Sequence, residues 1–247
     1  MSSPSAAAAA AAAAKPAIPE EGLPTVPDKF KDEIEATLAR VEAELADEAS
    51  WNFHSEKHGV KAYTKVDGSL TAAKGVGSLP YHPRAIWDLV IDSERRKSVD
   101  PQLASGKVLA HLDAQTTIDH LDYSPIFIVA GRDFCNLTHW RVLPDGSIVV
   151  IAQSIEEPEL CPSREPKVVR GQLHFALTKI TPNADYSGAE VTYIVKTDLR
   201  GSIPYRVASS AAAQQPFVIQ RFGEQLKKSK NLAEIAAQGK LTNTILA

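Results

Sequence analysis

The sequence predicts an α+β fold built on one large, curved antiparallel sheet. Short runs of alternating apolar and polar residues are separated by turn dipeptides such as Asp67-Gly68, which favour hairpins and therefore antiparallel neighbours. Helical spacing of apolar residues occurs before these runs, once among them and after the last one, unlike the regular strand–helix alternation of a doubly wound fold. Because a sheet of eight or nine strands twists and curls, we expect it to curve around the last helix.

The first helix is predicted after Pro27. Asp28 is placed to cap its N-terminus, and the face opposite the apolar stripe is acidic, as expected for a solvated surface. The apolar stripe, with spacings of three and four, consists of Phe30, Ile34, Leu38, Val41 and Leu45.

The remaining elements are expected in the order three strands, a second helix within residues 82–97, six strands and a last helix. The last helix is predicted from Ile203 to about Ala237. Pro216 lies inside it and should kink it, because proline lacks a backbone donor and clashes with the preceding turn.

We expect residues 28–236 to form the folded domain, between an Ala/Pro-rich disordered tail at residues 1–27 and a short C-terminal tail at residues 237–247. The first 27 residues have neither the basic start and leucine-rich core of a secretory signal nor the arginines of a transit peptide. Cys135 and Cys161 form no disulfide framework, so reduced thiols in a cytoplasmic protein are expected.

Composition and motifs argue against several classes of function. A net charge of −3 with a pI near 6.2 provides no basic surface for nucleic acid. The seven histidines have no metal-binding spacing, and neither a nucleophile elbow nor a phosphate-binding loop is present. Cys135 and His139 lie at i and i+4 of a strand, roughly 13 Å apart, which is too far for the hydrogen bond of a nucleophile–base pair. We therefore expect no metal, no cofactor and no catalytic residue.

The predicted strand RDFCNLTHW is unusual because neither of its faces is purely apolar. One face carries Arg132, Phe134, Asn136 and Thr138, and the other carries Asp133, Cys135, Leu137 and His139. A buried polar group without a partner costs about 1–3 kcal/mol, so these polar residues face solvent, a polar network or a bound ligand.

The stretch YSPIFIVAGRDF holds five consecutive apolar residues, 126–130, between a proline and Gly-Arg-Asp. The run is too short to cross a bilayer, which needs about 20 apolar residues. A buried strand end, a hairpin tip and an apolar loop are all compatible with it.

Several segments in order resemble the START (steroidogenic acute regulatory-related lipid-transfer) domain. Each is weak alone, and the ordered set, together with the matching order of helices and strands, carries the resemblance over about 210 positions. The segments are Trp51, SERRKSVDP (93–101), GRDF (131–134), AQSIEEPE (152–159), VVRG (168–171) and DLRGSIP (198–204).

The resemblance implies a helix-grip fold, in which a curved antiparallel sheet of about nine strands wraps around a long C-terminal helix and encloses a hydrophobic tunnel for one lipid. It implies a protein that carries or senses lipids at membranes and performs no chemistry. The apolar loop would then be a lid at the tunnel mouth that shields the lipid and touches a membrane, and Pro216 would be a weak point in a gating helix. The lid residues are Ile126, Phe127, Ile128 and Val129.

Two lipid classes can be compared by residue. Phosphatidylcholine-binding members use an arginine and an aspartate that match Arg96 and Asp100, but Val99 replaces the expected tryptophan. Their aromatic choline cage falls on Leu121, Phe134 and His174, of which Phe134 alone suits a cation–π contact.

Sterol-binding members carry an acid–arginine pair in the tunnel. Asp119 matches the acid, while Thr138 stands at the arginine position, so the ion pair is absent. A hydroxyl-bearing ligand such as a sterol or a related isoprenoid suits this set of groups best. The resemblance points His174 inward, whereas the alternation of apolar residues around it points His174 outward.

Together these comparisons give a predicted ligand-binding set. It consists of Arg96, Asp100, Asp119, Leu121, Tyr123, Arg132, Phe134, Asn136, Thr138, His174, Val207, Ala211, Val218 and Phe222. We expect a monomer that contacts membranes transiently and binds no nucleic acid. An enzyme using Asp119 and His174 as an acid–base pair, and an interaction module with a vestigial tunnel, stay open as alternatives.

Overall fold

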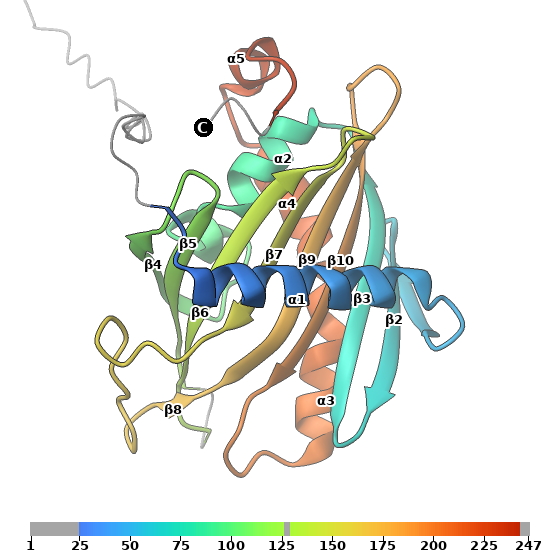
Figure 1. Ribbon diagram of the computed structural model, residues 1–247. Coiled ribbons are helices and arrows are strands. Elements are labelled where there is room, and N and C mark those ends of the chain that lie inside the picture. The colour runs from blue at the N-terminus through green and yellow to red at the C-terminus, as the bar shows by residue number, and fades with distance from the viewer. Residues whose placement is uncertain (1–24, 126–128, 243–247) are drawn as a thin grey trace, which may run out of the picture.

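The computed structural model describes residues 25–125 and 129–242. A highly twisted antiparallel sheet with the strand order β1-β2-β3-β10-β9-β7-β6-β5-β4 dominates this part of the chain (Figure 1), and β8 pairs in parallel with β6. The strands are β1 (Asn52–Lys57), β2 (Val60–Asp67), β3 (Leu70–Leu79), β4 (Leu103–His111), β5 (Thr116–Tyr123), β6 (Arg132–Val142), β7 (Ile148–Ser154), β8 (Val169–Arg170), β9 (Gln172–Pro182) and β10 (Ala189–Asp198).

The predicted α+β class and the nine-stranded antiparallel sheet are confirmed; the additional strand β8 is only two residues long. No helix of the described residues is long and apolar enough to cross a bilayer. The helical segments are α1 (Asp28–Ala46), α2 (Pro83–Val90), the 3-10 turn η1 (Arg95–Ser98), α3 (Tyr205–Gln214), the 3-10 turn η2 (Gln215–Phe217), α4 (Val218–Leu226) and α5 (Leu232–Ala237).

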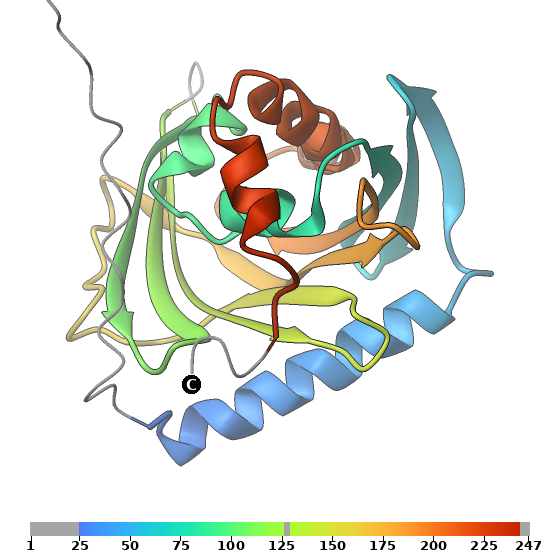
Figure 2. The same ribbon diagram turned by 90° about the horizontal axis from the view of Figure 1, so that it is seen from above.

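Helix α1 lies across one face of the sheet, and α2 and α4 lie on the other (Figure 2). The predicted stripe of α1 is buried except for its last member, Leu45, which is partly buried. It packs in a cluster with Leu137, Ile151 and Leu177 of β6, β7 and β9. Pro27, not Asp28, occupies the cap position, and Asp28 instead forms an ion pair with Lys31 at 2.9 Å.

The opposite, concave face holds the second part of the core. Trp87 of α2 packs edge-on against Trp140 of β6, with ring centroids 4.9 Å apart, and Ile219 and Phe222 of α4 are buried beside them. Because both faces of the sheet are covered, β9 buries residues on each side of the strand: Leu177 faces the α1 cluster and Ile180 belongs to the α4 cluster.

The expected single C-terminal helix is divided into three. Pro216 lies in η2, between α3 and α4, where the missing backbone donor replaces regular helix by a 3-10 turn. This turn lies directly on β3, since a Cβ at Gly75 would come within 2.8 Å of the Pro216 Cβ. After α4 the chain turns again, and α5 packs against α2.

The core extends slightly past the predicted domain boundaries. Val26 precedes α1 and Leu241 follows α5, and both are buried against the two clusters. Most of the predicted N-terminal tail and the last five residues lie outside the described residues.

Candidate functional site

A cavity of about 480 Å³ lies between the concave face of the sheet and the helical segments α2, η1 and α3. Strands β3, β5, β6, β7, β9 and β10 supply its walls. Leu121, Phe134, Val150, Leu173 and Val195 form much of its apolar lining. Because these side chains come from five neighbouring strands, the curvature of the sheet forms the hollow that α3 covers.

Ten of the predicted site residues line this cavity. They are Arg96, Asp119, Leu121, Tyr123, Val129, Arg132, Phe134, Asn136, Thr138 and Ala211. On β6 the members are every second residue, so the mixed face noted in the sequence is the face that borders the cavity. The predicted lid residues Ile126, Phe127 and Ile128 lie outside the described residues.

Five predicted site residues do not belong to the cavity lining: Asp100, His174, Val207, Val218 and Phe222. Val218 and Phe222 are buried in the core farther along the last helix, and Val207 is 53% exposed on α3.

His174 does not line the cavity, as the resemblance implied it would, and the β9–β10 ladder is irregular at this point. Phe175 pairs with Lys196 and Leu173 with Thr197, so His174 is the extra residue of a bulge. Leu173 lines the cavity instead. Burial lowers the pKa of His174, and its Nε2 atom is buried without a hydrogen-bond partner.

Arg96 extends from η1 into the wall of the cavity. Burial opposes the charge of its guanidinium, and the facing side chains of Tyr123, Tyr193, Asp100 and Asp119 nevertheless raise its pKa. The sequence has no arginine at position 138, but Arg96, from another element of the chain, lines the same cavity as Asp119. We find a cation and a carboxyl group in the same cavity.

Asp119 is the carboxyl group of this polar end, and it is 3% exposed. Its Oδ2 atom accepts a hydrogen bond from the Thr117 hydroxyl at 3.0 Å, while Oδ1 is buried without a partner. Burial raises the pKa of Asp119, although the hydroxyls of Thr138, Thr117 and Ser93 act in the opposite direction. A buried acceptor without a donor is costly, so this oxygen is suited to receive a donor from a ligand.

Aromatic side chains complete the polar end. Tyr123 and Phe134 pack edge to face with ring centroids 5.7 Å apart, and burial raises the pKa of Tyr123. Gly171 makes room for this ring, because a Cβ there would lie 2.4 Å from Phe134. Tyr193 on β10 also lines the cavity and was not predicted. Its signal is the alternation of Val191, Tyr193 and Val195 on one face of the strand.

The residues considered for catalysis do not come together. Asp119 lines the cavity and His174 does not, so the pair suggested for an enzyme has no shared surface. Cys135 lies in the α1 cluster, and burial with the neighbouring Cys161 raises its pKa to about 12. Within the described ranges there is also no cluster of three or more metal-ligating side chains.

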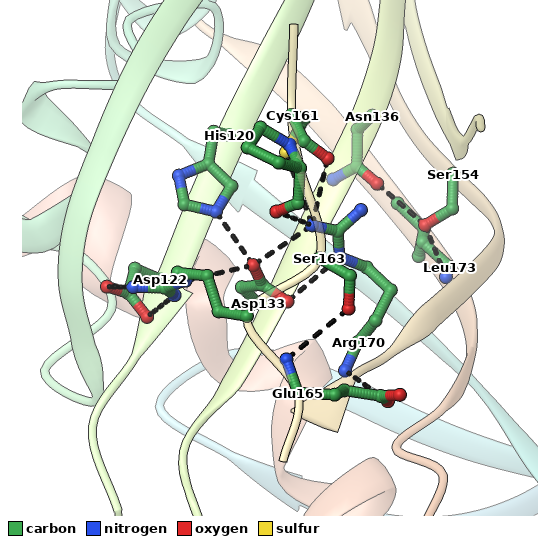
Figure 3. A network of polar contacts seen from close by, with 12 residues as sticks. His120, Asp122, Asp133, Asn136, Ser154, Cys161, Ser163, Glu165, Arg170 and Leu173 are labelled. Carbon is green, nitrogen blue, oxygen red and sulfur yellow. Dashed lines mark hydrogen bonds and ion pairs between the residues drawn. The ribbon is translucent and has the colours of Figure 1, made fainter. Parts of the chain in front are cut away.

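A second polar centre lies outside the cavity, around Asp133 (Figure 3). This carboxylate is 1% exposed and is held by both Nε (2.9 Å) and Nη2 (3.1 Å) of Arg170, with Nε2 of His120 at 3.0 Å. Arg164 adds a contact to Asp133 at 3.4 Å and a two-point pair with Asp122. The network fastens the segment 156–171 to β5 and β6. Because its charges are paired with one another, we interpret this network as one that stabilises the fold.

Comparison with known proteins agrees with the fold. Among curated sequences, StAR-related lipid transfer protein 5 of Bos taurus is 27% identical over 192 residues, which cover 71% of this chain and 88% of that protein. Protein ENHANCED DISEASE RESISTANCE 2-like of Arabidopsis thaliana is 29% identical over 138 residues, 53% of this chain; the match spans only 19% of that much longer protein.

Two solved human structures share the fold. StAR-related lipid transfer protein 5 superposes with a TM-score of 0.70 at 22% identity, covering 85% of this chain and 97% of the other. STARD10 superposes with a TM-score of 0.71 at 19% identity, covering 87% and 86%.

The family match is longer than any of the motifs that first suggested it. Residues 32–231, from the first helix to the start of α5, match the START domain. Together with the lipid-transfer proteins found by sequence and by structure, this match supports lipid binding in general. The chain belongs to the START domain family.

Proposed function

We propose that the protein binds one hydroxyl-bearing lipid, a sterol or a related isoprenoid, in its cavity and carries it between membranes. The observation that carries this proposal is the buried Asp119 carboxyl, which lines the cavity and whose Oδ1 atom has no hydrogen-bond partner. A volume of about 480 Å³ lies within the range of roughly 300–1,000 Å³ that is usual for one small-molecule ligand.

The lipid hydroxyl donates to Asp119 Oδ1 and accepts from a neighbouring donor, for which Arg96 and Ser93 are available at the same end of the cavity. The apolar body of the lipid lies against Leu121, Phe134 and Leu173. Each methylene group removed from water contributes about 0.8 kcal/mol, so the apolar lining supplies affinity and the polar end supplies orientation.

Membrane contact is proposed at the end of the molecule where α3 begins. Tyr205 and Val207, in the first turn of α3, are 51% and 53% exposed, and Val66, at the end of β2, is 65% exposed. The β2–β3 hairpin and the start of α3 lie at the same end of the molecule (Figure 1). Apolar and aromatic side chains of this kind partition into a lipid–water interface.

A phospholipid of the phosphatidylcholine type is the second candidate, favoured by one observation. The enclosed guanidinium of Arg96 is a natural partner for a phosphate. Against it, Asp119 would repel the phosphate, and a two-chain phospholipid is much larger than a sterol.

We propose binding and transfer without catalysis, by a monomer. A steady conversion of bound lipid, detected by mass spectrometry after extraction, would instead indicate an enzyme on this scaffold. A failure to bind any lipid would indicate an interaction module.

Titration with dehydroergosterol, a fluorescent sterol, tests the proposal through Asp119→Leu. Loss of one hydrogen bond to the buried carboxyl group should weaken binding by about 10- to 100-fold. The matched control is Asp122→Leu, the same change on the same strand at a residue paired with Arg164 and absent from the cavity lining; it should bind normally. Equal affinity of the Asp119 variant and the wild type would refute the proposed anchor, and Arg96→Gln with fluorescent phosphatidylcholine tests the second candidate.

A further inference from the structure

One arginine at the cavity rim, Arg132, makes contacts that a ligand-binding role does not explain. Its guanidinium donates through Nε to the Leu199 carbonyl at 3.1 Å and through Nη2 to the Arg200 carbonyl at 3.1 Å. Nη1 donates to the Ala130 carbonyl. One planar group therefore joins the start of β6 to the connection between β10 and α3.

Arg132 is held by these carbonyls without a carboxylate. The residue is 7% exposed, and no acidic side chain forms an ion pair with it among the described residues. Burial lowers the pKa of Arg132, which marks an incompletely compensated charge. Arg170, on the adjacent strand β8 and in the Asp133 network, shows the contrasting case of a guanidinium neutralised by a buried carboxylate. A cation held only by dipoles is released at lower cost than one held by an opposite charge.

The connection held by Arg132 is shaped to receive it. Arg200 and Gly201 both have positive φ angles, 49° and 68°, which turn successive carbonyls toward the guanidinium. A Cβ at Gly201 would lie 3.2 Å from the Arg132 Nη2 atom, so a glycine permits this approach. The motifs GRDF and DLRGSIP, far apart in the sequence, thus meet at one point.

Helix α3, which follows this connection, is mostly not buried. Only Ala213 of its ten residues is buried, and no side chain caps its N-terminus. Apart from the connection, Thr71 of β3 contacts the first turns of α3 through the hydroxyls of Ser209 (3.2 Å) and Tyr205 (3.4 Å). The bonds of Arg132 to the connection therefore add to the contacts with β3 that hold the start of α3 over the cavity.

We propose that Arg132 is a positioning residue: a latch that holds the β10–α3 connection, and with it the start of α3, against the rim of the cavity, and so sets the rate at which lipid enters and leaves. The connection is closed both before and after lipid exchange. The latch therefore affects the free-energy barrier to opening, and not the difference in free energy between the lipid-free and lipid-bound states. Weakening it should therefore accelerate uptake and release together and leave the equilibrium affinity nearly unchanged. This step rests on the proposed function, lipid transfer through this cavity.

The test compares Arg132→Lys and Arg132→Gln with Arg170→Lys. Lysine keeps the charge but lacks the planar guanidinium group, and glutamine lacks both. Both Arg132 variants should therefore raise the rate of amide hydrogen exchange in residues 199–209 about tenfold or more. They should speed dehydroergosterol transfer between phosphatidylcholine vesicles by a similar factor. Arg170→Lys should lower the melting temperature and change neither rate. Unchanged exchange in residues 199–209 would overturn the latch. A weaker affinity for dehydroergosterol at unchanged transfer rates would assign Arg132 to ligand binding instead.

A measurement on the wild-type protein covers the case in which the Arg132 variants do not fold. The Arg132 Nε–H and the Val207 amide, which is bonded to the Pro204 carbonyl, should show the same opening free energy in hydrogen exchange by NMR, because one event releases both. A protected Nε–H beside a freely exchanging Val207 amide would contradict the proposal. If the wild type binds no dehydroergosterol, the proposed function fails while this exchange measurement still decides on the latch.

Discussion

Two buried aspartates of neighbouring strands, Asp119 and Asp133, have opposite environments. Burial dominates at Asp119 and raises its pKa, whereas at Asp133 the hydrogen bonds of Arg170 and His120 outweigh burial and lower the pKa. The sequence shows both as polar positions of predicted strands, but the partners lie in distant segments: Arg96 in η1 and Arg170 in β8. This is why neither the polar end of the cavity nor the Asp133 network could be predicted from spacing along the chain.

Substitution of Asp133 should be strongly destabilising, because it leaves the half-buried Arg170 without its carboxylate. We expect Asp133→Asn to lower the free energy of unfolding by about 3 kcal/mol at neutral pH, measured by urea denaturation. Since the folded pKa of Asp133 is depressed, its contribution is complete above the unfolded pKa of about 3.9 and is lost as pH falls through the folded pKa. Asp122→Asn is the control and should cost about 1 kcal/mol or less, as its pair is more exposed. A similar cost for both would contradict the account.

Asp119 should show the opposite pH dependence. With its folded pKa raised, the wild type loses stability relative to Asp119→Asn as pH rises from about 4 through the folded pKa, and the difference is constant above it. Urea denaturation of both proteins without lipid, at a series of pH values, measures this gap. If the difference in unfolding free energy between Asp119→Asn and the wild type narrows with rising pH, the carboxylate is stabilised by partners and is not free to receive a ligand.

At the scale of the elements, local patterns predicted most of the fold. Period-two alternation identified the strands, and the stripe of α1 is buried where it was expected, because both depend on side chains close in sequence. The division of the last helix, the two-residue β8 and the bulge at His174 depend on contacts with distant strands, so spacing alone could not reveal them.

The contact between η2 and β3 gives a prediction for one of these elements. Gly75→Ala places a methyl group 2.8 Å from the Pro216 Cβ, so we expect a loss of about 1–3 kcal/mol of unfolding free energy from overpacking. Urea denaturation measures the loss, and Ser78→Ala on the exposed side of β3 is the matched control, with a change within about 0.5 kcal/mol. An unchanged stability of Gly75→Ala would show that the bend at Pro216 moves freely away from β3.

At the scale of the whole molecule, three regions are arranged around the curved sheet. The α1 face is a conventional core, the Asp133 network fastens the long segment before β8, and the concave face leaves a cavity closed by α3. The resemblance to START domains predicted the curved sheet and the C-terminal helix on its concave face, but not the Asp133 network, and the family match confirms the membership. The lipid class depends on the few polar residues of the cavity, which vary independently of the fold.

The most direct test of the account is native mass spectrometry of the full chain after incubation with vesicles containing equal amounts of phosphatidylcholine and a sterol. We predict one added mass per protein, equal to one sterol, which disappears in Asp119→Leu and persists in Asp122→Leu. A protein that stays without lipid, or that takes up phosphatidylcholine in preference to the sterol, would contradict the proposed role of Asp119 and of the cavity it borders.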